Sequence, residues 1–179
     1  DFAGDGRRFY TDGRNVHKYL KELVAAGGID GMVTVGEMSS TSLENCIGYT
    51  VAGNHELSMC FNFHHLKVDY KNGDKWALMP ADHLALKKLF QTWREGMQAH
   101  DGWNALFWCN HDQPRAVSRF GSDTTYWKES AKMLATAIHF MRGTPYIYQG
   151  EELGMTNAHF TSIDQYRDVE SLNYYSILR

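Results

Sequence analysis

Short apolar runs alternate with amphipathic stretches along almost the whole chain, and this alternation constrains the fold more than any other feature. In three long stretches apolar residues recur every three or four positions, as they do on one face of a helix. Between these stretches lie short apolar runs that favour buried strands. We therefore expect helices at 16–24, 86–97 and 131–141, a short helix at 169–178, and strands at 32–35, 57–63, 105–109 and 145–148.

Strands that alternate with helices predict parallel βα units, because a helix is the usual connection between two parallel strands. The 179 residues, 43% of them hydrophobic, suffice for one domain with a sizeable core and hardly for two. No repeat of fixed period and no linker-like segment interrupts the chain. The sequence therefore predicts a single α/β domain over residues 1–179.

Composition and charge exclude several classes of protein. The formal net charge of −3 speaks against a nucleic-acid partner, and no apolar run approaches the roughly 18 residues of a membrane span. Cys46, Cys60 and Cys109 are too widely spaced for a CxxC metal site or a disulfide framework, which favours a reducing, cytoplasmic compartment. The chain begins at Asp1 with a loop-like stretch and without a signal-peptide pattern, so we expect it to come from the middle of a longer protein.

Each predicted strand is followed by a polar cluster. The clusters are Glu37, the pair at 64–65, the triplet at 110–112 and the segment 149–152, and they are rich in histidine and carboxylate. The carboxyl ends of parallel strands lie on one face of the sheet, where active sites form. We therefore expect these clusters to converge in space, although a single polar cluster can also do no more than mark the end of a strand.

Glu37 and Asp112 are the natural pair of carboxylates for general acid–base chemistry. A carboxyl group at the end of an apolar strand is partly desolvated, which favours its protonated form near neutral pH. A second, ionised carboxylate nearby can stabilise an oxocarbenium-like transition state, and two such groups flank the bond that is cleaved in glycoside hydrolysis. Carboxylate pairs also serve structural ion networks, so the pattern alone leaves both interpretations open.

Two further patterns carry alternatives. His65, His111 and Asp112 could converge on zinc, although the sequence has neither an HxH nor an HExxH motif. Lys67 and Lys75 flank the segment after the second predicted strand. Such lysines are usually solvated surface charges, yet two of them on one loop could hold an anionic group of a substrate.

Three segments resemble the alpha-amylase-type glycoside hydrolases, family 13, in the order in which that family carries them: residues 34–41, 109–115 and 143–152. The resemblance spans essentially the whole chain and implies a (β/α)8 barrel, a retaining mechanism and no cofactor. Residues 37–41, 61–70 and 5–13 are most similar to the branch that hydrolyses a disaccharide phosphate, trehalose 6-phosphate, to glucose and glucose 6-phosphate. The alternatives are a neutral α-glucoside, as used by oligo-1,6-glucosidases and dextran glucosidases, and a non-catalytic binding role.

The resemblance assigns roles to individual residues. Glu37 is expected to be the general acid and base, and Asp112 to hold sugar hydroxyls and steady the transition state. His111 is expected to hydrogen-bond the sugar, and Arg115 to order this region. The full set of substrate-binding residues that we expect is Asn110, His111, Arg115, His64, Lys67 and Lys75.

One family motif is absent, namely the strand that ends in Arg-x-Asp and carries the nucleophilic aspartate. Asp1 has no strand before it and does not match that role. We therefore interpret the chain as the second half of the barrel, about strands five to eight with their helices, and expect the isolated chain to be inactive. A half barrel has two unpaired sheet edges, so we expect it to bind the remainder of its own barrel or to associate with itself.

Overall fold

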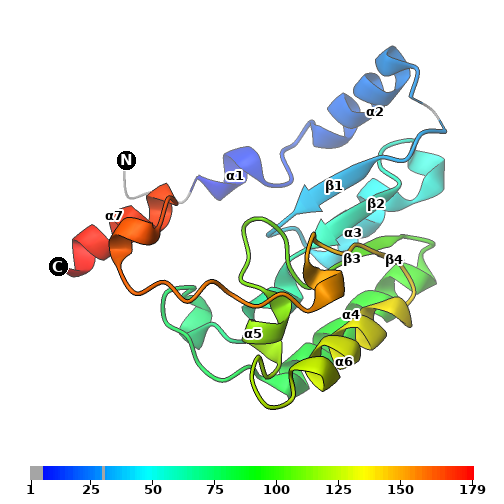
Figure 1. Ribbon diagram of the computed structural model, residues 1–179. Coiled ribbons are helices and arrows are strands. Elements are labelled where there is room, and N and C mark those ends of the chain that lie inside the picture. Colours follow the sequence, from blue (N-terminus) through cyan, green and yellow to red (C-terminus); the bar gives the residue numbers. More distant parts are fainter. Residues whose placement is uncertain (1–5, 30) are drawn as a thin grey trace.

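The computed structural model describes residues 6–29 and 31–179, which form a parallel sheet with helices packed along it (Figure 1). Within those residues the sheet has four strands in the order β1-β2-β3-β4, and each strand is parallel to its neighbours. The strands are β1 (Val35–Met38), β2 (Met59–Asn62), β3 (Asn104–Leu106) and β4 (Thr144–Pro145). This arrangement confirms the predicted parallel βα units. The predicted loop at 1–5 lies outside the described residues.

Helices connect consecutive strands and confirm the four helices that the sequence predicts. The α-helices are α1 (Arg7–Tyr10), α2 (Val16–Gly27), α3 (Leu43–Thr50), α4 (His83–Ala99), α5 (Ala116–Phe120), α6 (Trp127–His139) and α7 (Val169–Leu178). The short 3-10 turns are η1 (Ala52–Asn54), η2 (His64–Lys67), η3 (Lys71–Gly73), η4 (Glu151–Leu153) and η5 (Ile163–Gln165). In Figure 1, α1 and α7 lie beyond the ends towards which β1 and β2 point.

The first strand is displaced from its predicted position. Met32 and Val33 are exposed, and the strand begins at Val35, where the ladder with Met59 starts. The apolar run before β1 therefore does not form a buried strand, and Glu37 lies within β1 instead of after its end.

The third and fourth strands are shorter than predicted. Residues 107–109 are buried as the sequence suggests, but they lie beyond the last residue of β3. β4 ends at Pro145, although the Tyr146 N–H still donates to the Leu106 carbonyl at 2.7 Å. Of the predicted strand at 145–148, only Pro145 therefore belongs to the paired strand, and Tyr146 adds one further hydrogen bond to β3.

Three α-helices, α1, α3 and α5, were not predicted from the sequence. α3 begins after Ser42, whose side chain accepts a hydrogen bond from the Asn45 N–H at 3.3 Å. A serine before an apolar-periodic stretch is a start signal, but the stretch is only two turns long and was not singled out. α5 is a single short turn after the 110–115 loop, and its three buried residues face the main core.

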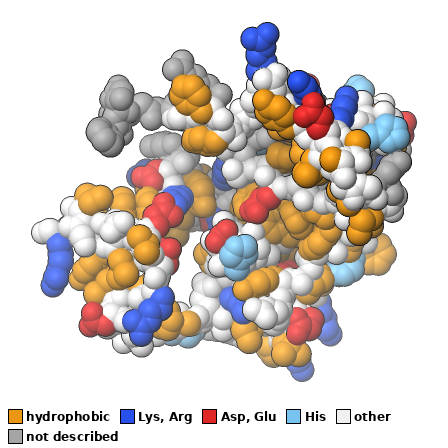
Figure 2. All heavy atoms as spheres, turned by 90° about the horizontal axis from the view of Figure 1, so that it is seen from above, with side chains coloured by type: hydrophobic (Ala, Val, Ile, Leu, Met, Phe, Trp, Pro, Cys, Tyr) orange, Lys and Arg blue, Asp and Glu red, His pale blue; other side chains and the backbone are white. Residues whose placement is uncertain are grey.

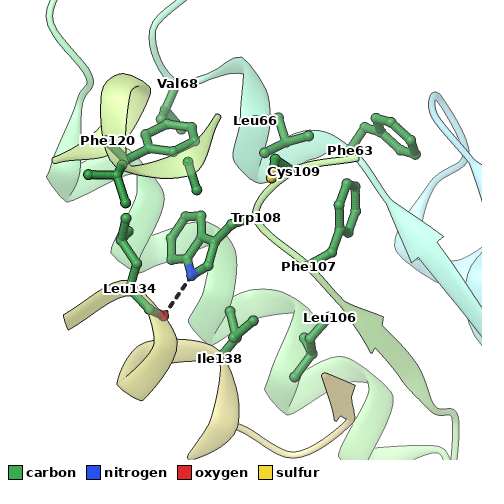
Figure 3. Close-up of a cluster of buried hydrophobic side chains, with 12 residues drawn as sticks. Phe63, Leu66, Val68, Leu106, Phe107, Trp108, Cys109, Phe120, Leu134 and Ile138 are labelled. Carbon is green, nitrogen blue, oxygen red and sulfur yellow. Dashed lines mark hydrogen bonds between the residues drawn. The ribbon is translucent and has the colours of Figure 1, made fainter. Parts of the chain in front are cut away.

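The main core lies between the sheet and helices α4, α5 and α6 (Figure 3). Trp108 is almost fully buried there and packs against the rings of Phe90 and Phe120. Its indole Nε1–H donates to the Leu134 carbonyl at 2.7 Å, so the buried polar group of the ring is satisfied. The indole therefore ties the end of β3 to α6.

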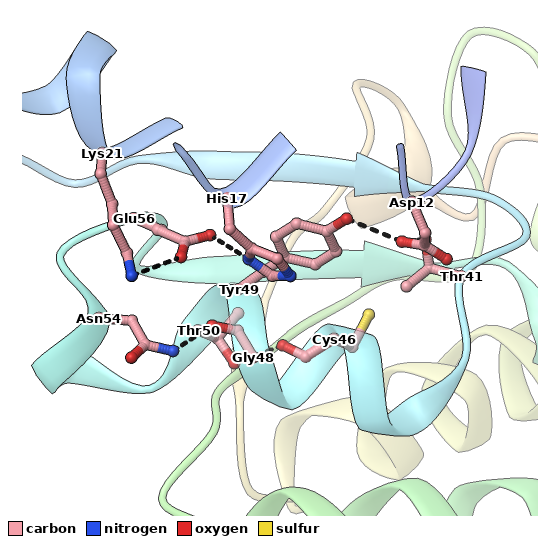
Figure 4. Close-up of polar contacts among 10 residues, drawn as sticks. All are labelled: Asp12, His17, Lys21, Thr41, Cys46, Gly48, Tyr49, Thr50, Asn54 and Glu56. Atoms are coloured by element: carbon pink, nitrogen blue, oxygen red, sulfur yellow. Dashed lines mark hydrogen bonds and ion pairs between the residues drawn. The ribbon is translucent and has the colours of Figure 1, made fainter. Parts of the chain in front are cut away.

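A second, smaller core lies under α3, and polar contacts fasten α2 to it (Figure 4). The Glu56 carboxylate, buried at its side chain, binds His17 at 2.8 Å and lies 3.6 Å from the Lys21 ammonium. The Tyr49 hydroxyl donates to Asp12 at 2.8 Å, just before α2. These contacts place α2 over the β1–β2 half of the sheet.

β1 and β4 are the edge strands of the described sheet, as expected for half of a barrel. Figure 2, seen from above the view of Figure 1, shows hydrophobic side chains gathered between scattered charges. Exposed apolar residues such as Leu23, Met32 and Val33 lie on or near α2 and β1. Among residues 6–29 and 31–179, no helix combines the length and hydropathy that a bilayer crossing requires.

Candidate active site

A pocket of about 230 Å³ lies at the carboxyl ends of the parallel strands, which we call the sheet-end pocket. Its lining comes from all four strands or from the residues just after them. Of the four polar clusters, Glu37 and the first two residues of the triplet at 110–112 reach it, whereas the pair at 64–65 and the segment 149–152 do not. The residues that line it are Glu37, Phe61, Phe107, Cys109, Asn110, His111, Tyr146, Ile147 and Tyr148.

Glu37 lines this pocket from β1. The sequence analysis expected its carboxyl group to be partly desolvated, but Glu37 is an exposed residue in the structure. The physical reason is its place on an edge strand, because no described strand pairs with the outer side of β1. Glu37 therefore lines the pocket from the unpaired edge of the described sheet.

Asp112 does not line the sheet-end pocket. It lies on a second hollow of about 520 Å³, which we call the Asp112 hollow and which also contains Lys75 and Arg119. His111 lines the sheet-end pocket, and its Nε2 lies 3.5 Å from Asp112 Oδ2. The two predicted carboxylates therefore face two neighbouring hollows that His111 links.

The loop from 110 to 115 is held by its own side chains. Asn110 Oδ1 accepts a hydrogen bond from the Asp112 N–H at 2.9 Å, which fixes the turn that carries His111. The Arg115 guanidinium donates to the Gln149 carbonyl and lies 5.0 Å from the centre of the Tyr148 ring. Arg115 thus joins the loop after β3 to the loop after β4.

Aromatic rings form the floor of the sheet-end pocket, and the sequence analysis missed them as site residues. Phe61 lies edge-on to Phe107 at 5.0 Å between ring centres and to Tyr146 at 4.7 Å. All three positions fall inside or just after predicted strands, where apolar side chains were expected to be core. Successive side chains of a strand face opposite sides of the sheet, so the position of each ring along its strand was the signal available in the sequence.

Two predicted substrate ligands lie away from this pocket and make structural contacts. His64 Nε2 lies 2.9 Å from the Thr41 carbonyl, and the imidazole stacks on Trp93 at 5.2 Å. The Lys67 ammonium donates to the Ser39 carbonyl at 2.9 Å. Both side chains therefore brace the loop after β1 from η2.

Three titratable groups with shifted pKa values, His65, Cys109 and Glu151, lie in or near the segments that follow β2, β3 and β4. Burial lowers the pKa of His65 to about 4, and its Nε2 lies 2.7 Å from the Phe107 carbonyl. Burial raises the pKa of Glu151, which accepts hydrogen bonds from Cys109 and from the Tyr148 N–H. Burial also raises the pKa of the Cys109 thiol to about 11, so this thiol stays protonated.

The structure does not form the zinc site that the sequence left open. His65 is buried and bonded to a backbone carbonyl, whereas His111 and Asp112 lie on exposed loop positions. Among the residues that the structure describes, no group of three or more His, Cys, Asp or Glu side chains could hold a metal ion.

The side chains of the described site indicate what kind of ligand it can bind. An exposed carboxylate and an imidazole face a pocket with an aromatic floor, which suits a ligand with one apolar face and several hydroxyls. Next to it lies the Asp112 hollow, whose charged side chains are four carboxylates and two cations.

Comparison with known proteins identifies relatives of this arrangement. The family model described as "Alpha amylase, catalytic domain" matches residues 1–176. Trehalose-6-phosphate hydrolase of Bacillus subtilis is 65% identical over 174 residues, which cover 96% of this chain and 31% of that protein. Oligo-1,6-glucosidase of Bacillus cereus is 50% identical over 172 residues, which cover 95% of this chain and 30% of that protein.

A solved structure shares the fold throughout. The crystal structure of Bacillus licheniformis trehalose-6-phosphate hydrolase superposes with a TM-score of 0.91 at 61% identity, over 99% of this chain and 32% of that one. The chain therefore spans about a third of the length of the relatives that it matches.

Proposed function

This chain belongs to the alpha-amylase family of glycoside hydrolases, family 13, and we propose that it supplies the second half of the catalytic (β/α)8 barrel of a retaining α-glucosidase. The observation that carries the proposal is the convergence of Glu37 and His111 on one pocket at the carboxyl ends of the strands, with Asp112 beside His111. Glycoside hydrolysis requires two carboxyl groups beside the scissile bond, and Glu37 supplies one of them to this pocket.

In the proposed reaction Glu37 acts as general acid and then as general base. Its carboxyl group protonates the leaving glycosidic oxygen while a carboxylate from outside this chain attacks the anomeric carbon. The Glu37 carboxylate then removes a proton from water, which releases the sugar from the covalent intermediate. His111 hydrogen-bonds the sugar, and Asp112 holds its hydroxyls and steadies the positive charge of the transition state. Asn110 and Arg115 keep this loop in place.

We propose trehalose 6-phosphate as the substrate and glucose and glucose 6-phosphate as the products. The higher identity to a trehalose-6-phosphate hydrolase, 65% against 50% for an oligo-1,6-glucosidase, supports this choice. Lys75 lies on the Asp112 hollow and is the better candidate for the phosphate, while Lys67 is the second. Three free, buried cysteines among the described residues support a reducing, cytoplasmic location.

A neutral α-glucoside is the second candidate substrate, and the charge of the Asp112 hollow favours it. The charged residues on that hollow are Asp69, Asp112, Asp168, Glu170, Lys75 and Arg119, so carboxylates outnumber cations. A non-catalytic binding role is the third candidate, and the presence of both Glu37 and Asp112 speaks against it.

Steady-state kinetics on the complete enzyme that carries this chain test the proposal. We expect hydrolysis of trehalose 6-phosphate with a kcat/KM well above that for isomaltose or an unphosphorylated aryl glucoside. Glu37→Gln removes the proton donor and should lower kcat by about 10²- to 10⁴-fold without comparable loss of binding. A Glu37→Gln enzyme with wild-type kcat would overturn the role of Glu37, and equal kcat/KM for both substrate types would favour the neutral glucoside.

A further inference from the structure

Two contacts fasten the loop after η3 to helix α7 beside the Asp112 hollow. The Lys75 ammonium pairs with Glu170, and the Trp76 ring stacks on Tyr174 at 4.4 Å with an angle of 7° between the ring planes. The Lys75 Nζ also lies 5.2 Å from the centre of the Trp76 ring. We call these four residues the Lys75–α7 clasp.

Both cations of the hollow are already paired, but the two pairs differ in exposure. Arg119 binds Asp69 through two hydrogen bonds of 2.7 and 2.8 Å, with side chains only 7% and 9% exposed. The side chains of Lys75 and Glu170 are 44% and 61% exposed. Separating the buried pair would leave a buried charge without its counter-charge, whereas an exposed pair is held weakly. Lys75 is therefore the cation that can change partners.

The neighbours of Lys75 also limit where its ammonium can go. The Trp76 ring, fixed by its stack on Tyr174, lies against the cation, and Asp168 and Glu170 line the same hollow from the start of α7. An anionic group that enters the hollow meets Glu170 as a competitor for Lys75 and as a like charge. The Glu170 carboxylate thus weakens anion binding both by occupying Lys75 and by repelling the anion.

We propose that Glu170 is a specificity-determining residue, which holds Lys75 until the phosphate of the substrate replaces the Glu170 carboxylate. This inference rests on the proposed trehalose-6-phosphate hydrolase activity and goes beyond it. The exchange breaks one exposed ion pair and forms another between the same ammonium and a phosphate oxygen. Glu170 thereby sets how strongly the phosphate contributes to binding, without touching the reacting atoms.

The test is Glu170→Gln in the complete enzyme, with trehalose 6-phosphate and an unphosphorylated aryl glucoside as substrates. Loss of an exposed competitor should lower KM for the phosphorylated substrate by about two- to fivefold. The KM for the aryl glucoside and the kcat for both substrates should stay unchanged. The matched control is Glu95→Gln, because Glu95 is 57% exposed and pairs with Arg94 on α4, away from the hollow.

Lys75→Ala distinguishes the possible failures. If Lys75→Ala raises KM for trehalose 6-phosphate alone and Glu170→Gln changes nothing, the exchange is wrong while the phosphate contact stands. An enzyme that does not prefer the phosphorylated substrate at all refutes the proposed function itself. The exchange is also refuted if Glu170→Gln still lowers KM in the Lys75→Ala background.

Discussion

Lowering the pH below neutral should destabilise the fold through one buried histidine, His65. The imidazole lies among the rings of Phe90, Phe107 and Trp108, and its Nε2 lies at hydrogen-bond distance from the Phe107 carbonyl. A carbonyl accepts but does not donate, so the neutral ring carries its proton on Nε2. Burial is the main cause of the lowered pKa of His65, and the nearby charges of Arg119 and His64 act in the same direction.

The size and sign of the effect follow from the two pKa values. The pKa of His65 is about 4 in the folded protein against 6.5 in the unfolded chain. Below pH 6.5 His65 binds a proton in the unfolded chain but not in the folded protein. The free energy of unfolding therefore falls as the pH drops, and the loss is complete near pH 4. A difference of this size corresponds to about 3 kcal/mol of unfolding free energy. Above pH 6.5 His65 contributes no pH dependence.

Urea unfolding at pH 7.5, 5.5 and 4.5, followed by tryptophan fluorescence, measures this loss, and His65→Gln isolates it. Glutamine can still donate to the Phe107 carbonyl, but it does not titrate. Exposed carboxylates titrate equally in both proteins, so the difference between their pH profiles reports His65 alone. We expect the wild type to lose stability more steeply than His65→Gln between pH 6.5 and 4.5. Parallel profiles would refute the reasoning.

Three further outcomes are expected. Asp69→Asn should destabilise the protein by roughly 3–5 kcal/mol, because it leaves the buried Arg119 guanidinium without its counter-charge, and thermal melting measures the loss. Gly143→Ala should cost about 1–3 kcal/mol by the same assay, because φ is 149° there and a Cβ would lie 2.7 Å from the Asn104 carbonyl oxygen. Trp108→Phe should lower the melting temperature by removing the hydrogen bond to Leu134, at about 1 kcal/mol or more, and an unchanged melting temperature would contradict that contact.

Periodicity predicted the elements of this fold well where the pattern was long. α4 has an apolar stripe of about three turns from Leu86 to Met97, and its buried Trp93 and Met97 lie on that stripe. The strands were located only approximately, because a short apolar run does not show where its ladder begins. β1 illustrates this, since its start at Val35 is set by pairing with Met59 and not by the apolar residues before it.

The sequence predicts on which edge of the sheet the site lies, but not which side chains contact one another there. Parallel strands force the segments after them to one edge, so Glu37 and the 110–112 loop come together. Which way a loop side chain turns depends on local hydrogen bonds. Asn110 fixes the turn that places His111 on one hollow and Asp112 on the next, and no spacing in the sequence encodes that division.

The exposure of Glu37 connects the catalytic proposal to the open edge of β1. A general acid holds its proton near neutral pH only when burial or a neighbouring negative charge disfavours the carboxylate. Within the described residues Glu37 has neither enclosure on its outer side nor a pairing strand beyond β1. In the proposed barrel, the strand that covers this edge also carries the nucleophilic carboxylate. Closing the barrel there therefore both buries the Glu37 carboxyl group and brings a negative charge close to it.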